Sequence, residues 1–122
     1  MYSMYLNVLK SKLHMARVTE ARLDYEGSIT IDTELIDAVR FVEHEKVLVA
    51  NLANGNRFET YVIPGAPGSG VICLNGAAAH LCNIGDSIII MSFCMIPQDD
   101  AGSHRPFILV LNEKNKPKGG LR

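Results

Sequence analysis

The first part of the chain alternates between apolar and polar positions and then changes period. Over residues 12–24 the alternation is typical of a half-buried β-strand interrupted near Arg17, with apolar positions at Leu13, Met15, Ala21 and Leu23. Asp32 is then placed to cap a helix, and Glu34 puts a negative charge in its first turn. The apolar face of this helix comprises Leu35, Ile36 and Val39. We predict one strand that ends at residues 25–28 and a short helix after it.

Later hydrophobic runs predict a hairpin and further strands. Asn54-Gly55 is a strong turn signal because both residues tolerate positive φ, and it lies between β-rich runs at 47–50 and 58–63. The Pro and Gly residues within 64–70 predict a surface loop. The remaining predicted elements are strands at 71–74, 87–95 and 107–111 and a turn with one short helix at 75–80.

Many short strands separated by turn residues, with only two short helices, favour a small and mostly antiparallel β-barrel. Closure of such a sheet removes its exposed edges. The length of 122 residues suits one domain, which we assign to residues 1–112. The charged, Gly-containing tail at residues 113–122 is expected to be mobile. The order of the strands does not follow from this pattern.

The charge balance and hydropathy of the chain argue against two classes of partner. The 12 Lys and Arg residues balance 13 Asp and Glu residues, and no basic stripe follows a strand or helix. No nucleic-acid partner is therefore expected. The longest uncharged apolar stretch, residues 88–96, falls well short of the roughly 18 residues that span a bilayer. No membrane segment is expected either.

The cysteines and histidines argue against a disulfide framework and a metal site. Cys73, Cys82 and Cys94 have no C-x-x-C spacing, and no signal peptide precedes them. We therefore expect reduced cysteines and a cytoplasmic protein. The four histidines are His14, His44, His80 and His104. They are scattered, with no i, i+4 pair and no familiar zinc spacing to a cysteine, so no metal is expected.

Gly-Ser pairs occur at Gly27-Ser28, Gly68-Ser69 and Gly102-Ser103. Each pair by itself is typical of a turn, because Gly supplies unusual φ values and Ser caps turns. None lies in the G-x-S-x-G pattern of an α/β-hydrolase. A Ser-His-Asp hydrolase that uses Ser28 with His14 or His80 stays open, although no spacing argues for it.

Three blocks of sequence, taken together and in order, resemble the motifs of the aspartate 1-decarboxylase family. They are Tyr25-Glu26-Gly27-Ser28-Ile29-Thr30-Ile31-Asp32, Asn54-Gly55-Asn56-Arg57-Phe58-Glu59-Thr60-Tyr61 and Asn75-Gly76-Ala77-Ala78-Ala79-His80. Lys12-Leu13-His14 and Gly85-Asp86 also match, and the similarity extends over residues 4–111. The resemblance implies a mainly β fold, a small double-psi β-barrel with short helices. It also implies a homotetramer with active sites between neighbouring subunits.

The same resemblance implies a proenzyme that cuts its own backbone between Gly27 and Ser28 and converts Ser28 into a pyruvoyl group. That covalent, self-generated group takes the place of an external cofactor and decarboxylates L-aspartate to β-alanine through a Schiff base. Ser28 Oγ attacks the Gly27 carbonyl, and we expect a strained turn at Gly27 to keep that carbonyl open. The residues assigned to self-cleavage are Tyr25, Glu26, Gly27, Ser28, Thr60 and Asn75.

Roles in substrate binding also follow from the resemblance. Arg57 suits a carboxylate of aspartate as a bidentate partner, and Lys12 adds a second positive charge. The other residues assigned to the substrate are Thr60, Gly76, Ala77 and Ala78, the last three because N–H groups at a helix start receive anions. Tyr61 is assigned as the proton donor that completes β-alanine. Thr60 and Tyr61 are adjacent, so a regular strand would point them to opposite faces.

A second hypothesis stays beside the enzyme. In it, the chain is a non-catalytic double-psi barrel that binds a ligand or serves in assembly, and the motifs are kept for packing. Such a chain would not be cleaved, so its intact mass distinguishes the two hypotheses.

Overall fold

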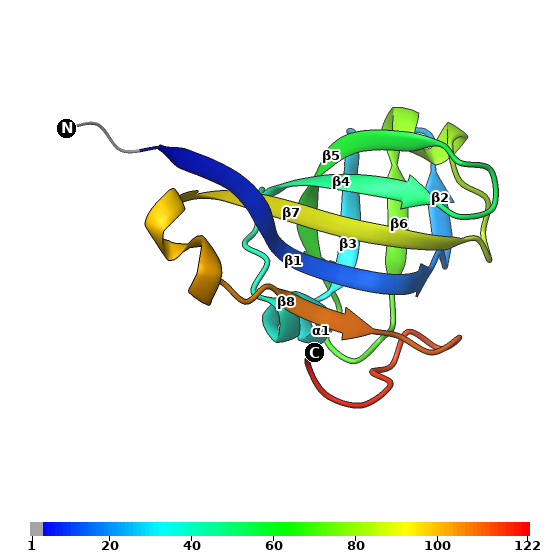
Figure 1. Cartoon of the computed structure of the whole chain (residues 1–122). Helices are drawn as coiled ribbons and strands as arrows, with labels where there is room; N and C mark the ends of the chain where they lie inside the picture. Colours follow the sequence, from blue (N-terminus) through cyan, green and yellow to red (C-terminus); the bar gives the residue numbers. More distant parts are fainter. Residues whose placement is uncertain (1–3) are drawn as a thin grey trace.

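The computed structural model describes residues 4–122, which form strands and short helices joined by turns and loops (Figure 1). Within this range eight strands form one sheet in the order β2-β6-β3-β5-β4-β7-β1-β8. The strands are β1 (Tyr5–Arg17), β2 (Glu20–Arg22), β3 (Ser28–Asp32), β4 (Lys46–Asn51), β5 (Arg57–Gly65), β6 (Ile72–Asn75), β7 (Ser87–Pro97) and β8 (Phe107–Val110). The helices are α1 (Thr33–Val39) and the 3-10 helices η1 (Gly76–His80) and η2 (Gln98–Ser103). None of these helices is long and apolar enough to cross a membrane.

The sheet closes into a barrel through the segment that joins β1 and β2. When β8, which lies beyond β1, is set aside, β1 and β2 are the two end strands of this order. In the chain, only Val18 and Thr19 separate them. The Thr19 N–H donates to the Ile72 carbonyl at 2.8 Å, so pairing continues across the junction. The mainly β fold with short helices is confirmed. The sheet is mixed: four strand pairs are antiparallel, as expected for most of the sheet, and three are parallel, namely β1 with β8, β2 with β6, and β3 with β5.

The core of the barrel is built from alternate residues of the strands. Its fully buried side chains include Leu13, Ile29, Ile31, Val47, Val49, Val62, Ile72, Leu74, Ile88 and Ile90. Successive side chains of a strand point to opposite faces, so the residues between these positions lie on the outer face of the sheet. On β3, β5 and β6 the outer-face residues are Ser28, Thr30, Tyr61, Ile63, Cys73 and Asn75.

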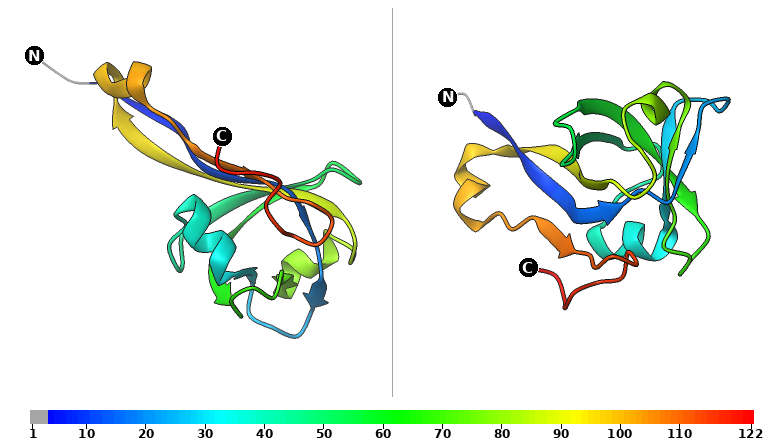
Figure 2. Two further views of the ribbon diagram at one scale, coloured as in Figure 1. Left: turned by 90° about the horizontal axis from the view of Figure 1, so that it is seen from below. Right: turned by 90° about the vertical axis from the view of Figure 1, so that its right-hand side faces the viewer.

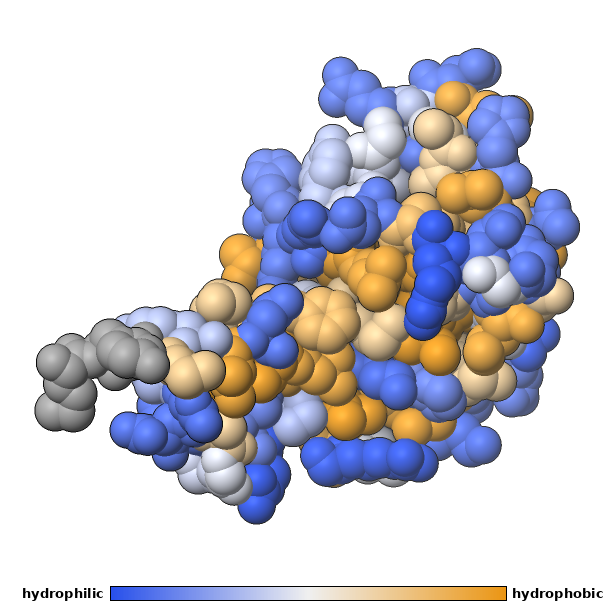
Figure 3. All heavy atoms as spheres, turned by 45° about the horizontal axis from the view of Figure 1, so that its top comes forward, coloured by the Kyte–Doolittle hydropathy of each residue, from blue (hydrophilic) through white to orange (hydrophobic). Residues whose placement is uncertain are grey.

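β1 and β7 extend beyond the barrel as a two-stranded arm that ends in η2 (Figure 2). Their pairing along the arm runs from Leu9 with Phe93 outward to Tyr5 with Pro97. Met4, Tyr5, Phe93 and Met95 are exposed on this arm. In Figure 3, apolar residues in orange run from the arm onto the barrel. A contiguous apolar surface of this kind is typical of a contact between protein chains.

Helix α1 and the β4–β5 hairpin confirm predictions that rested on cap and turn residues. Asp32 caps α1 by accepting the Glu34 N–H at 2.9 Å, and Arg40 ends the helix in the left-handed conformation. Gly55 has a φ of 76° in the hairpin turn. The strand predicted to end at residues 25–28 ends a few residues earlier, at Arg22 of β2, and the chain turns over residues 23–27. Strand β3, which begins at Ser28, and helix η2 were missed. Strand β1 also starts at Tyr5, well before residue 12.

Asp32 joins the 64–70 loop to the start of α1. Its carboxylate is 1% exposed and accepts the N–H groups of Glu34, Gly68 and Gly70 at 2.8–2.9 Å. Burial raises the pKa of the Asp32 carboxyl, but the three N–H donors and the charge of Lys116 together lower it more. The pKa of Asp32 therefore lies below its ordinary value.

The tail segment 113–122 contacts this loop through Asn115, which is 1% exposed. The Asn115 amide donates to the carbonyls of Arg17 and Gly70 at 2.8 Å and accepts the Arg17 N–H at 2.7 Å. Lys116 Nζ donates to the Gly68 carbonyl at 2.7 Å. The start of the tail is thus bonded to the barrel. Its mobility and the domain boundary at residue 112 stay predictions.

We predict that Asp32→Asn lowers the free energy of unfolding by about 1–3 kcal/mol, because an amide NH₂ would face a backbone N–H. The exposed Asp37→Asn in α1 is the matched control and should change it by less than about 0.5 kcal/mol. Because the folded pKa of Asp32 is lowered, its contribution is present above the unfolded pKa and is lost as the pH falls through the folded pKa. Urea unfolding of both variants at one protein concentration and several pH values measures this. Equal midpoints for the two variants would contradict it.

Candidate functional site

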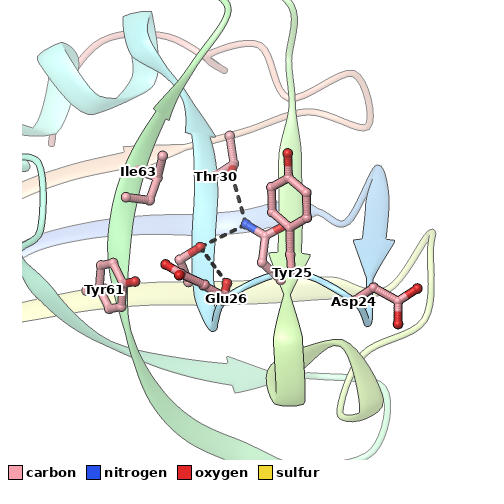
Figure 4. Close-up of a pocket in the computed structure, with 8 residues that line it drawn as sticks. Asp24, Tyr25, Glu26, Thr30, Tyr61 and Ile63 are labelled. Atoms are coloured by element: carbon pink, nitrogen blue, oxygen red, sulfur yellow. Dashed lines mark hydrogen bonds between the residues drawn. The ribbon is translucent and has the colours of Figure 1, made fainter.

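A pocket of about 420 Å³ opens on the outer face of β3, β5 and β6 (Figure 4). Its lining residues are Asp24, Tyr25, Glu26, Ser28, Thr30, Tyr61, Ile63 and Asn75. The pocket therefore brings together members of all three sequence blocks. Of the predicted site residues, Tyr25, Glu26, Ser28, Tyr61 and Asn75 lie here.

Ser28 is the first residue of β3 and pairs with Asn75 of β6 in antiparallel register. It is 5% exposed, and its hydroxyl donates to the Glu26 carbonyl at 3.3 Å. The same oxygen accepts a hydrogen bond from Asn75 Nδ2 at 2.9 Å. Figure 4 draws both bonds. A nucleophilic oxygen is therefore held from two sides, directly after the peptide bond that joins Gly27 to Ser28.

Asn75 holds this arrangement at the end of β6. Its side chain is buried, and Nδ2 donates to Thr30 Oγ1 at 3.0 Å in addition to Ser28 Oγ. Its Oδ1 accepts from the Cys73 thiol at 3.3 Å. Both amide hydrogens and the amide oxygen are therefore engaged. Asn75 can act as a fixed donor towards Ser28.

Gly76 lies against the segment that precedes Ser28. It has a φ of +70°, and a Cβ at this position would come within 2.8 Å of the Gly27 backbone and of the Tyr25 carbonyl oxygen. Gly27 itself has no positive φ, and a Cβ there would meet nothing within 4 Å. Gly27 therefore has no left-handed backbone conformation, and the strained turn expected there stays a prediction. The glycine that the packing requires is Gly76, because only it allows η1 to approach so closely.

Thr60 lies on the other face of β5 from Tyr61, as alternation predicts. It pairs with Val47, whose side chain is in the core, and paired residues share a face. Thr60 lines a separate hollow of about 280 Å³ with Lys46, Glu59 and Tyr61. The structure therefore does not bring Thr60 to Ser28 within one chain.

Arg57 and Lys12 belong to a second outer surface, formed by β1, β7, β4 and β5. Lys12 pairs with Met91, Met91 with Leu48, and Leu48 with Glu59, which lies two residues from Arg57 on the same face. Arg57 is exposed and lies four residues from Tyr61, about 13 Å along the strand. Neither cation lines the Ser28 pocket.

His14 adds an imidazole beside Lys12 on β1. Its Nδ1 is buried and has no hydrogen-bond partner among the described residues. Burial, followed by the charges of Lys12 and Arg122, lowers the pKa of His14. The imidazole is therefore neutral at pH 7.

Ala77 and Ala78 follow Gly76 in η1, with Ala77 exposed and Ala78 packed against the core. Three pocket residues that no role had been assigned to are Asp24, Thr30 and Ile63. Thr30 lies two residues after Ser28, and residues two apart in a strand face the same side. A prediction of strand β3 would therefore have placed Thr30 beside Ser28. Within residues 4–122, no group of three or more His, Cys, Asp or Glu side chains is arranged to hold a metal ion.

Comparisons with known proteins match nearly the whole chain. The family model described as Aspartate decarboxylase matches residues 4–118. The chain is 57% identical to the aspartate 1-decarboxylase of Bacillus subtilis, over 93% of this chain and 89% of that protein. It is 56% identical to that of Caldicellulosiruptor bescii, over 93% of this chain and 88% of the relative. The crystal structure of the rationally designed mkDPBB_sym_86 protein aligns with a TM-score of 0.48 and 12% identity, covering 63% of this chain and 90% of that one.

We predict that Gly76→Ala lowers the free energy of unfolding by about 1–3 kcal/mol, because it adds backbone strain and a clash with the Gly27 segment. Gly27→Ala is the matched control and should change it by less than about 0.5 kcal/mol, since the new methyl group meets open space. Urea unfolding of both variants at equal protein concentration gives the comparison. A larger loss for Gly27→Ala than for Gly76→Ala would contradict the assignment.

Proposed function

This chain belongs to the aspartate decarboxylase family, and on that premise we propose that it is the precursor of a pyruvoyl-dependent aspartate 1-decarboxylase. In this proposal it cleaves itself between Gly27 and Ser28 and then converts L-aspartate to β-alanine and carbon dioxide. The observation that carries the proposal is the Ser28 hydroxyl, which Asn75 and Glu26 hold beside the peptide bond to be cut.

Self-cleavage needs only groups of the chain and water. Ser28 Oγ attacks the Gly27 carbonyl carbon, and the bond from that carbon to the Ser28 nitrogen breaks, which leaves an ester and a free amine. Loss of the Ser28 α-proton expels the Gly27 carboxylate and leaves dehydroalanine at position 28. Water then hydrolyses the dehydroalanine to the pyruvoyl group and ammonia. In the first step the proton of the Ser28 hydroxyl passes to the departing Ser28 nitrogen. Asn75 Nδ2 supports this step, because an N–H donor stabilises the negative charge that Oγ carries once its proton has left.

The site fits a pyruvoyl group at position 28. Ser28 is 5% exposed at the wall of a pocket of about 420 Å³, which leaves room for a small amino acid in front of it. Once formed, the group supplies a carbonyl that takes up the electrons released as carbon dioxide leaves. Tyr61 lines the same pocket, which supports its assignment as the donor of the proton that the former α-carbon of aspartate must receive.

Charge supports an active site that is shared between two copies of the chain. The pocket lining includes two acidic residues, Asp24 and Glu26, and no Lys or Arg. Aspartate brings two carboxylates, so one chain's pocket by itself repels the substrate. Lys12 and Arg57 lie on the other outer surface, where a neighbouring chain can present them. We therefore assign Ser28, Tyr61, Asn75 and residues 76–78 to one subunit and Lys12 and Arg57 to its neighbour.

The exposed apolar arm of β1 and β7 supports the homotetramer that this arrangement needs, because it offers a surface for a second copy. The role of Thr60 in binding and cleavage stays a prediction, and its absence from the lining of the Ser28 pocket suggests the same sharing between chains. Cys73, Cys82 and Cys94 are free thiols in the structure. We keep the cytoplasm as the expected location.

We predict that the purified chain separates under denaturing conditions into residues 1–27 and residues 28–122, and that the larger fragment has no free N-terminal amine. Ser28→Ala should stay folded and uncut, because it loses only the attacking oxygen. Intact-mass measurement and N-terminal sequencing check both statements. A mature, active preparation that consists of one uncut chain would point to the non-catalytic barrel or to another mechanism.

Coexpression of two inactive variants tests the shared site. Ser28→Ala chains lack the pyruvoyl group but keep Arg57. Arg57→Ala chains keep Ser28, and so can form the pyruvoyl group, but lack Arg57. In mixed oligomers, about a quarter of the sites should combine Ser28 from one chain with Arg57 from the other, and activity should return to about that fraction. Doubly tagged oligomers are assayed against each variant alone. If both groups act within one chain, no intact site forms and no activity returns.

A further inference from the structure

We propose that Cys73 is a positioning residue for self-cleavage, because its thiol fixes which end of the Asn75 amide faces Ser28. This inference rests on the proposed function. Cys73 lies two positions before Asn75 on β6, so the two side chains are on the same outer face of the strand. Cys73 does not line the Ser28 pocket and acts only through Asn75.

The Asn75 amide can be placed in two orientations of nearly equal shape. In the observed one, Nδ2 donates to Ser28 Oγ at 2.9 Å and to Thr30 Oγ1 at 3.0 Å. The two hydroxyls do not choose between the orientations, since each can either donate or accept a hydrogen bond. The only other partner of the amide among the described residues is the Cys73 thiol, 3.3 Å from Oδ1.

The Cys73 thiol favours one orientation, because its S–H lies nearer to Asn75 Oδ1, at 3.3 Å, than to the Leu74 carbonyl oxygen, at 3.9 Å. Its sulfur accepts a hydrogen bond from an amide NH₂ only weakly. Cys73 is 3% exposed, and burial, followed by the negative charge of Glu20, raises the pKa of its thiol. It therefore stays protonated at neutral pH, and S–H is a donor whose natural partner is the amide oxygen. A reversed amide would set its NH₂ group against this S–H. With Asn75 1% exposed, water does not compensate for that loss.

The orientation matters for the reaction at Ser28. In the observed orientation, Ser28 Oγ receives an N–H bond while its own proton goes to the Glu26 carbonyl. An N–H donor stabilises the negative charge that Oγ carries once its proton has left and before that charge passes to the Gly27 carbonyl oxygen. In the reversed orientation, the amide oxygen would instead accept the Ser28 proton and would repel that charge. Chains in the reversed state would therefore cleave slowly.

The test follows the cutting of purified precursor over time by intact mass. Cys73→Ala removes the donor, and Cys73→Val removes it while keeping the volume, so both should slow cleavage roughly five- to tenfold. Cys73→Ser keeps a donor for Asn75 Oδ1, although its oxygen also accepts from an NH₂ group, so it should cleave faster than Cys73→Ala and more slowly than the parent chain. Cys82→Ala is the matched control, because Cys82 is also buried, with a pKa raised to about 11, and it does not line the Ser28 pocket. It should cleave at the parental rate.

The conservative variant separates positioning from packing. A thermal unfolding scan of each variant identifies any that does not fold, and Cys73→Val decides if Cys73→Ala is unstable. Parental cleavage rates in Cys73→Ala and Cys73→Val would overturn the inference, as would a Cys73→Ser chain that is as slow as Cys73→Ala. If the parent chain is never cut, the proposed function itself fails, and that outcome is distinct from cleavage that ignores Cys73.

Discussion

Burial of the aliphatic residues of β3 and β6 decides where the chemistry of this protein lies. Ile29, Ile31, Ile72 and Leu74 are 0% exposed, so the residues between them must occupy the outer face of the sheet. A slip of one residue would turn Ser28 and Asn75 into the barrel core and bring four aliphatic side chains to the outer face, which the hydrophobic effect strongly opposes. The same register sets Ser28 opposite Asn75. Core packing therefore selects the hydrogen bond on which the candidate site is built.

A reactive group on the outside of a barrel gains from a partner. The outer pocket is open to water and its charged lining residues are acidic, whereas the cations suited to a dicarboxylate lie on another surface of the same barrel. Two copies that bring these surfaces together would join the electrophile to the carboxylate-binding groups and exclude water. The apolar arm would supply the area for that contact. Assembly and catalysis would then depend on the same interface.

The features that could be predicted from the sequence depend on neighbours in the chain. The Asn54-Gly55 turn and the Asp32 cap each rest on groups within a few residues, so their residue types alone were enough. Strand β3 was missed because its partners are distant: the Ser28 to Asn75 bond spans 47 residues. The need for glycine at position 76 was also hidden, since it arises from contact with the Gly27 segment. Motif resemblance found Arg57, but only the strand register shows that it lies away from Ser28.

The geometry at Gly27 bears on how a peptide bond could be made to break. Backbone strain of about 1–3 kcal/mol would raise the rate by roughly 5- to 150-fold, but Gly27 has no positive φ and has open space around it. Positioning has a larger scope, because well-oriented intramolecular groups reach effective concentrations of about 10⁵ M or more. The burial of Ser28, its two hydrogen bonds and the close support from Gly76 all act in that way. Self-cleavage would then depend mainly on holding a nucleophile still beside the peptide bond that it attacks.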